Sequence, residues 1–414
     1  MIAITNKDRE IIRGLAKGYL EVCESERNKK AKLLWRDHNS LKQTHPPVII
    51  DCFWTSRPMA NEIDEILEPN KTESLGWVEN WFKRRIWQGN VIHDDTVYDP
   101  WFPMESIRQQ SKGFWGFDLK RNEDEHSKGY RTLPAISKME DLEKLSATPH
   151  IVIDRNPPEV QLVREIIGDI MPVHVNCATV YPVWGGSDLS EALGKLVGLE
   201  EFMLMTYDEP ELIHRLMAFM RDSVLNNLEK GEAAGDWTTA DGCSYVINHT
   251  ADLPEPKTNS YGAKLKDLWF FTHAQEFESV GSRQHEEFLL NYQMPIMKKF
   301  GLVSYGCCET LDNKIDLLRK IPNLRRICIG PRADVKKSAE QIGRDYIMSW
   351  RPNPSMVTHG YDRENCRKIV RKGLEDSRDC NIELMLKEML TVQNDPYRLA
   401  DFAEMAVEEA ENIG

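Results

Sequence analysis

Two adjacent thiols and a carboxylate, Cys307, Cys308 and Glu309, follow a short apolar run and precede a segment that predicts a helix. Thiolates are soft metal ligands and nucleophiles, whereas a carboxylate is a harder ligand and an acid or base. In α/β barrel enzymes, the side chains that do chemistry lie where a strand ends and the next helix has not yet begun. This tripeptide is therefore the first candidate for a functional site.

Successive side chains of an extended strand point to opposite faces, so Cys307 and Glu309 share one face and Cys308 joins them only where the chain has turned. Glu276, with His273 beside it, ends another predicted strand and could supply further ligands. Zinc suits such mixed sulfur, oxygen and nitrogen ligands, in a tetrahedral site with one position open to substrate. The structural alternatives are a buried cysteine that packs as a small apolar group and a salt bridge of Glu276 at the rim of the sheet.

Polar residues end most of the other apolar runs, as expected where catalytic groups gather at the carboxyl ends of parallel strands. We predict catalytic roles for Asp51, His93, Asp94 and Tyr305, and substrate-binding roles for Asn176, Gln275, Arg351 and Asn353. For Asp51 the alternative is a structural hydrogen bond, and His93 with Asp94 could equally belong to a capped loop.

The elements that position these residues are strand-then-helix units of about 25 to 45 residues, which predict a parallel barrel. We expect a single (β/α)8 TIM-like barrel over 46–414, preceded by a helical extension over 1–45. An irregular insertion around 98–130, rich in Pro, Trp, Phe and Gly, is expected to act as a lid or binding loop. The main predicted strands lie at 48–54, 91–95, 171–178, 268–276, 303–305, 326–329 and 346–350.

Composition narrows the class of protein. The chain has 414 residues and a formal net charge of -13, which disfavours nonspecific binding to nucleic acid or to an anionic membrane. Nine scattered cysteines and a polar N-terminus predict a reducing, cytoplasmic location. We expect no association with a membrane, because no apolar run approaches the roughly 20 residues that span a bilayer.

Several segments resemble the uroporphyrinogen decarboxylase superfamily, which includes decarboxylases and zinc-dependent, corrinoid-linked methyltransferases. The likeness runs through most of the chain, and its motifs are 192–208, Pro210–His214, Gln284–Tyr292, Asp334–Ala339 and Pro352–Pro354. In the methyltransferase branch a strand ends in a His-x-Cys pair that binds zinc. Aligning the following helix puts Cys308 on the ligand cysteine of the family and Gly306 in place of its histidine.

A further cysteine of the methyltransferase branch is absent near Asn353. The resemblance therefore implies a zinc site built differently, with Cys308 kept and with Glu309, Cys307 and Glu276 as substitutes. The decarboxylase branch binds a tetrapyrrole with an Arg-rich loop after its first strand, where this chain has Arg57 and the acid Asp51. Porphyrinogen decarboxylation is therefore disfavoured.

The resemblance leads us to expect a demethylating methyltransferase of anaerobic one-carbon metabolism, acting on an aryl methyl ether or a methylamine. Zinc would polarise the atom that bears the methyl group, and Asp94 would protonate the leaving group. The methyl group would pass to the cobalt of a corrinoid (cobalamin) on a separate protein, because no Asp-x-His-x-x-Gly signature occurs in this chain.

Two alternatives remain open from the sequence. One is a metal-independent decarboxylase or lyase that binds a small carboxylate through Arg351, Arg332 or Arg57. The other is a barrel that only binds a ligand or partner, with the aromatic loop near 98–116 exposed. The resemblance also implies a homodimer.

Overall fold

The fold is built around one sheet. The computed structural model describes residues 4–53, 57–123, 130–178, 181, 188–243 and 245–413. The strands of the main sheet are β1 (Val48–Ile50), β8 (Trp269–Thr272), β9 (Leu302–Tyr305), β10 (Leu324–Ile329), β11 (Ile347–Trp350) and β12 (Asn381–Leu386). They are parallel and lie in the order β1-β12-β11-β10-β9-β8. The carboxyl ends of all these strands therefore meet at the same edge.

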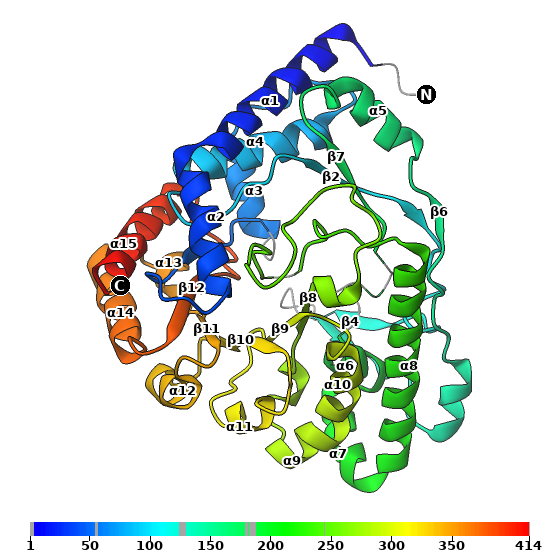
Figure 1. Cartoon of the computed structure of the whole chain (residues 1–414). Helices are drawn as coiled ribbons and strands as arrows, with labels where there is room; N and C mark the ends of the chain where they lie inside the picture. The colour runs from blue at the N-terminus through cyan, green and yellow to red at the C-terminus, as the bar shows by residue number, and fades with distance from the viewer. Residues whose placement is uncertain are drawn as a thin grey trace.

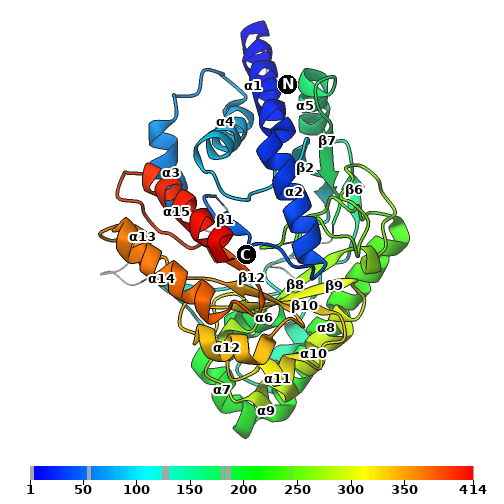
Figure 2. The ribbon, with the colours of Figure 1, turned by 60° about the vertical axis from the view of Figure 1, so that its left-hand side comes forward.

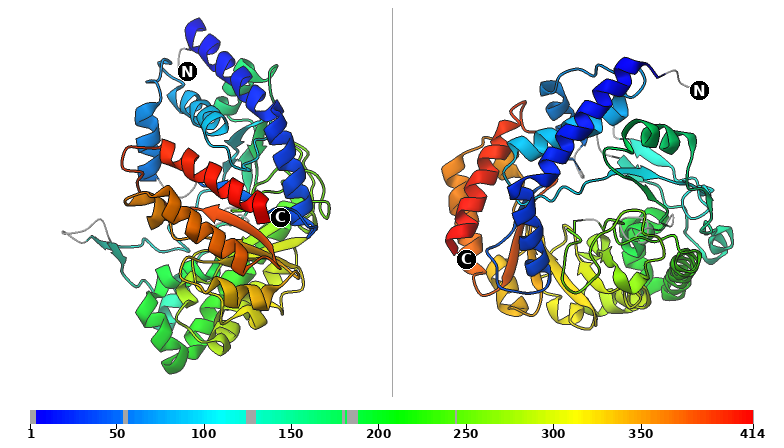
Figure 3. Two further views of the ribbon diagram at one scale, coloured as in Figure 1. Left: turned by 90° about the vertical axis from the view of Figure 1, so that its left-hand side faces the viewer. Right: turned by 45° about the horizontal axis from the view of Figure 1, so that its top comes forward.

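Further strands complete a ring of elements that Figure 3 shows in its right-hand view, with the chain running around it from the N-terminus to the C-terminus. A separate parallel pair consists of β2 (Phe102–Glu105) and β7 (Val173–Asn176). Two antiparallel pairs are β3 (Ile107–Arg108) with β6 (Val152–Asp154), and β4 (Arg121–Glu123) with β5 (Tyr130–Thr132). The predicted α/β class is confirmed as a curled sheet of six parallel strands, and hydrogen bonding among the described residues does not close it into an eight-stranded barrel.

Helices cover the outside of this ring (Figure 1). In the first half of the chain they are α1 (Asn6–Glu24), α2 (Glu26–Asn39), α3 (Arg57–Ile66), α4 (Gly76–Val91), α5 (Pro158–Ile167), α6 (Leu189–Val197), α7 (Leu199–Asp208) and α8 (Pro210–Ala234). In the second half they are α9 (Ser282–His285), α10 (Asn291–Met297), α11 (Ile315–Leu318), α12 (Val335–Ile342), α13 (Ser355–Thr358), α14 (Arg363–Asp376) and α15 (Tyr397–Ile413). Figure 2 shows α14 and α15 side by side next to β12. Within the described ranges, every helix is too short or too polar to traverse a lipid bilayer.

The strands are almost continuously apolar because both faces of the sheet are covered, as is typical of parallel sheets. The buried charged residues Arg326 and Glu383 are exceptions to this pattern, and they form an ionic group. Arg326 of β10 donates to the carboxylate of Glu383 on β12 at 2.8 Å, and His38 of α2 contacts the same carboxylate at 3.3 Å. The C-terminal end of α2 therefore packs directly against the sheet through His38.

Two elements differ from the prediction. The predicted strand at 91–95 is wrong, because α4 continues to Val91 and the chain then turns at His93 and Asp94. Strand β12 was not predicted at all. The region expected to be an irregular insertion contains β2 and β3 and part of the β4–β5 hairpin, while the helices expected near 362–375 and 396–412 are confirmed as α14 and α15.

Side chains, not another strand, occupy the outer edge of β1. The Asp94 carboxylate accepts from the backbone N–H of Ile50 at 2.8 Å and from both donors of Thr96, and the Asp95 carboxylate accepts from the N–H of Val48 at 2.9 Å. Burial raises the pKa of Asp94 to about 7 and that of Asp95 to about 6. The two aspartates satisfy backbone donors that a closed barrel would pair with a neighbouring strand.

The raised pKa of Asp94 predicts that the stability of the fold decreases as the pH rises. The folded-state pKa of Asp94 is about 7, above the value of about 3.9 for an unfolded aspartate. Protonation of Asp94 therefore stabilises the fold at low pH, and this contribution to the free energy of unfolding is lost as the pH rises through about 7. Asp94→Asn keeps only one acceptor oxygen, and we expect it to lose about 1 kcal/mol at pH 5. The gap to the wild type should narrow by pH 8, as measured by urea unfolding; a gap independent of pH would contradict a raised pKa.

Candidate functional site

A turn at the end of β9 brings both cysteines of the predicted site to one place. Gly306 follows the strand with φ +99°, where a Cβ would lie 2.6 Å from the side chain of Leu311. The chain has therefore left the extended conformation before Cys307, and the alternation of strand faces no longer separates Cys307 from Cys308. Both thiols come to lie within reach of the end of β12.

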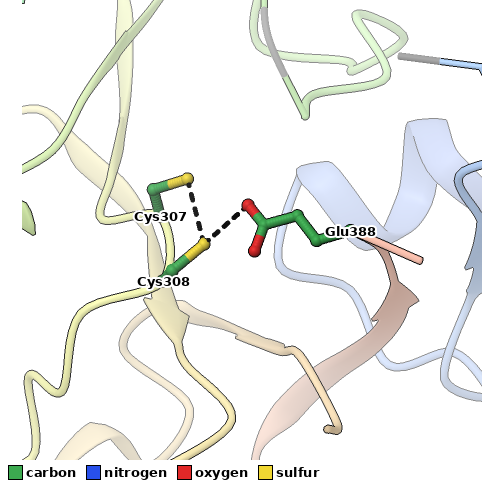
Figure 4. A group of neighbouring side chains, drawn as sticks. All are labelled: Cys307, Cys308 and Glu388. Carbon is green, nitrogen blue, oxygen red and sulfur yellow. Dashed lines mark hydrogen bonds between the residues drawn. The ribbon is translucent and has the colours of Figure 1, made fainter. Parts of the chain in front are cut away.

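Lys387 and Glu388, the first residues after β12, lie beside the two thiols. Figure 4 shows Glu388 with Cys307 and Cys308. The two sulfur atoms are 3.5 Å apart, and the Lys387 ammonium lies 3.2 Å from Cys307 Sγ and 3.0 Å from Cys308 Sγ. Glu388 accepts from Cys308 Sγ at 2.9 Å and from Lys387 at 2.6 Å. We call Cys307, Cys308 and Glu388 the thiol cluster; their ligand atoms all lie within 4.8 Å of one another.

Glu388 has an unusual backbone conformation. Its φ is +62°, in the left-handed region that residues with a side chain rarely adopt. Such conformations gather at functional sites, where the surrounding structure holds them in place. Here the conformation turns the Glu388 carboxylate toward Cys308 (Figure 4).

A second buried cation adjoins the cluster. Arg351, which follows β11, donates to the carbonyl oxygen of Cys307 and to the sulfur of Cys328 at 3.0 Å. Its guanidinium lies 4.7 Å from the ring centroid of Tyr245, and the Lys387 ammonium lies 4.3 Å from the same ring. The predicted residue Arg351 is thus at the site, where its guanidinium is hydrogen-bonded to the protein chain.

These cations make one thiol acidic. The hydrogen bond with Cys308 is the largest cause that lowers the pKa of Cys307, to about 5, and Arg351, Lys387 and His273 add to it against the opposing effect of burial. The same hydrogen bond, with burial, raises the pKa of Cys308. At neutral pH the pair therefore shares one negative charge, centred on Cys307.

His273 belongs to a neighbouring group of side chains with Asp188 and Glu276. Burial lowers the pKa of His273, but Asp188 and then Glu309 and Cys307 outweigh it and raise the pKa to about 9. Asp188 lies 3.4 Å from the imidazole, although its oxygens also accept from backbone N–H groups of α6 and of His273. Glu276 accepts from Ser190 at 2.5 Å, and burial raises its pKa. This group holds an imidazolium beside the thiol cluster.

Two of the predicted site residues are bound into the fold. The Glu309 carboxylate is buried and accepts from the backbone N–H of Ala274 at 2.7 Å and of Cys307 at 2.8 Å, so it supports the turn. The Tyr305 hydroxyl is hydrogen-bonded to His285 and Gln293 at 2.8 Å each, on the helix side of the sheet.

The remaining predicted residues are dispersed. Asp51 and Asn176 line a cavity, whereas Asp94 supports the edge of β1. His93 and Asn353 are exposed, and Asn353 accepts from the backbone N–H of Ser355. Gln275 begins a short 3₁₀ turn two residues after His273. Residues 54–56 and the side chain of Arg57 lie outside the described part of the structure.

The cavity that Asp51 and Asn176 line has a volume of about 630 Å³, within the range of small-molecule sites. Its wall is formed by the residues after β1, by 96–105, by the end of β7 and by 240–249. Tyr245 lies on this wall and also faces Lys387 and Arg351, so it connects the cavity with the thiol cluster.

Lys387, Glu388 and Tyr245 were not found from the sequence. The rule that selected the other candidates, a polar residue directly after an apolar run, also applies to Lys387 and Glu388 after Leu384-Met385-Leu386. They were missed because strand β12 was missed. Tyr245 lies in an irregular segment, and no sequence pattern marks it.

Comparison with known proteins supports the fold. No family model matches the chain, and no curated protein matches it. Among solved structures, the chain is similar to a methyltransferase from Methanosarcina mazei, with a TM-score of 0.50 and 10% sequence identity; the match covers 92% of this chain and 97% of that chain. At this identity the likeness concerns the fold alone, and the resemblance to the uroporphyrinogen decarboxylase superfamily stays a prediction.

The geometry of the thiol cluster predicts that the Lys387 ammonium stabilises the thiolate form of Cys307. In Lys387→Met the ammonium between the two sulfurs is lost, so we expect the midpoint of thiolate formation to rise by about 1 to 3 pH units. Thiolate absorbance in the ultraviolet, titrated in both proteins, measures the midpoint. Lys299→Met, which removes an exposed lysine paired with Glu229, should leave it unchanged; an unchanged midpoint in Lys387→Met would contradict the role of Lys387 and leave the effect to Cys308, Arg351 and His273.

Proposed function

We propose that the protein is a zinc-dependent methyltransferase that takes a methyl group from a small methylated compound and passes it to the cobalt of a corrinoid on a separate protein. The observation that carries the proposal is the convergence of Cys307, Cys308 and Glu388 at the carboxyl edge of the sheet. The fold likeness to a solved methyltransferase supports it.

The thiol cluster fits zinc in its donor atoms. Two sulfurs and one carboxylate oxygen are a set that zinc accepts, and three protein ligands leave a fourth position open, as in catalytic zinc sites. The Lys387 ammonium lies close to all three donors, which shows that this place favours a positive charge. Zinc bound there would supply a Lewis acid that polarises the atom bearing the methyl group.

Other residues would prepare the site for this reaction. Arg351 and Lys387 favour the thiolate form of Cys307, which is the form that binds a metal ion. His273 carries a proton at neutral pH and lies close enough to Cys307 for each to affect the pKa of the other. We assign to His273 the protonation of a leaving group that the sequence suggested for Asp94, because Asp94 is engaged at the edge of β1.

The alternative of a decarboxylase acting on a small carboxylate has less support. Arg351 is engaged with protein groups, and Arg332 forms an ion pair with Glu278. The carboxylates of Asp51 and Asp241 line the cavity and would repel an anionic substrate.

Metal analysis tests the zinc site. We expect about one zinc per chain after growth with zinc, and we expect Cys308→Ala and Glu388→Gln each to weaken binding at least tenfold in competition with a chromogenic chelator. Glu309→Gln is the matched control, since its carboxylate binds backbone groups; it should lower stability and retain zinc. Wild type without zinc, or zinc affinity equal in wild type and Cys308→Ala, would reject the site.

Methyl transfer is tested separately. Incubation of the zinc-loaded protein with reduced free cobalamin and a panel of methyl ethers, methylamines and methyl thioethers should yield methylcobalamin from one substrate class, followed by absorbance. His273→Gln should lower the rate most for poor leaving groups, because these depend on protonation. Release of CO2 from a carboxylate by metal-free protein would favour the decarboxylase instead.

A further inference from the structure

The wall of the cavity combines aromatic rings with carboxylates. The rings belong to Tyr19, Phe53, Trp81, Tyr98, Trp101 and Tyr245, and the carboxylates to Asp51, Asp99, Glu105 and Asp241. Among the described lining residues, Arg85 supplies the one permanent positive charge. Aromatic faces and negative charge around a hollow are the two features that bind organic ammonium ions.

The negative charge is not spread evenly over this wall. Asp99 is paired with Lys32 at 2.8 Å, and Glu105 with Arg108 at 2.6 Å, both from outside the cavity. The Asp241 carboxylate accepts from the backbone N–H of Thr238 at 2.8 Å and lies 3.3 Å from His174. Among the described residues, no lysine or arginine is paired with Asp241, whose side-chain partners are a backbone N–H and a histidine.

An aromatic ring lies close to this carboxylate. The ring of Trp101 is 6.3 Å from that of His174, centroid to centroid, and His174 in turn contacts Asp241. Trp101, His174 and Asp241 all belong to the cavity wall. A cation placed there would meet a π face and a carboxylate together, and the burial of Asp241 weakens the screening of its charge by water.

The part of the cavity wall at Tyr245 adjoins two cations. Tyr245 lies between the cavity and the thiol cluster, and its ring already faces the Lys387 ammonium and the Arg351 guanidinium. Tyr245 is therefore already engaged with two cations and is a poorer place for a further positive group than Trp101. The charges therefore orient a ligand with its cationic end at Asp241 and its other end toward the thiol cluster.

We propose that the cavity binds an organic ammonium ion, held at Asp241 and Trp101. In combination with the proposed methyl transfer, on which this second step rests, the methyl donor has an ammonium group at one end and the methylated heteroatom at the other, toward the cluster. The ammonium group is an anchor and does not react, so its nitrogen needs no lone pair for zinc. The methyl group leaves without its bonding electrons, the reduced corrinoid of the partner supplies the electron pair, and the heteroatom keeps the original pair and takes up a proton.

Calorimetry with a pair of probes of equal shape tests the ligand class. Choline carries a trimethylammonium group, and 3,3-dimethylbutan-1-ol replaces its nitrogen with carbon. We expect choline to bind at least about tenfold more tightly, which corresponds to the strength of a desolvated cation–π and charge contact. Equal or tighter binding of the alcohol, or binding of neither probe, would overturn the proposal.

Variants locate the binding place. Asp241→Asn keeps an acceptor for the N–H of Thr238 but removes the charge, and it should weaken choline binding about tenfold without affecting the alcohol. Trp101→Leu should weaken choline binding as well, and thermal unfolding shows whether each variant is folded. Glu229→Gln, at an exposed ion pair with Lys299, is the matched control. Loss of choline binding in Glu229→Gln, or unchanged binding in both Asp241→Asn and Trp101→Leu, would place the cation elsewhere and overturn the assignment.

The outcomes for the ligand and for the reaction are separable. Choline binding by a protein that holds no zinc and forms no methylcobalamin would leave the cation site standing and reject the proposed function. Methyl transfer from neutral ethers, together with tighter binding of 3,3-dimethylbutan-1-ol than of choline, would support the proposed function and reject the cation site.

Discussion

Arg351 and Lys387 bring two positive charges beneath the surface at the carboxyl edge of the sheet, and the groups around them are arranged to compensate those charges. A buried cation is stable only where hydrogen-bond acceptors and negative charge surround it. The guanidinium takes a carbonyl oxygen and the Cys328 sulfur, and the ammonium takes two sulfurs and the Glu388 carboxylate. The acidity of Cys307 is a consequence of this requirement, and the same anionic groups that accommodate an ammonium also suit a metal ion.

The strands that the sequence predicts correctly are those with uninterrupted apolar runs, such as β1 and β9, because burial on both faces of a parallel sheet permits little else. Strand β12 does not follow this rule, because Glu383 interrupts its apolar run. The buried Glu383 carboxylate is compensated by its pairs with Arg326 and His38. Those partners come from β10 and α2, far away in the sequence. A pattern confined to one segment cannot reveal them, and because β12 was not predicted, the candidate ligand Glu388 was missed as well.

The candidate site residues show a second limit of prediction from the sequence. Their position after a strand predicts correctly that Cys307, Cys308 and Arg351 meet at one edge, but it does not predict where a side chain points. Glu309 accepts from one N–H of its own loop and from one N–H of the loop after β8, and Tyr305 points outward to the helices. The backbone angle at Gly306 turns the chain before Cys307, Cys308 and Glu309. The alternation of strand faces therefore does not separate the two thiols.

The carboxylates of Asp94 and Asp95 have a consequence for the behaviour of the protein in crowded solution. A sheet that does not close leaves an edge strand whose free N–H groups can recruit a strand of another molecule, which leads to aggregation. In this chain the outward N–H groups of Val48 and Ile50 are already occupied by side chains that no incoming backbone can easily displace. The ring can therefore stay open at β1, where the residues after the strand line the cavity, without offering that edge to other chains.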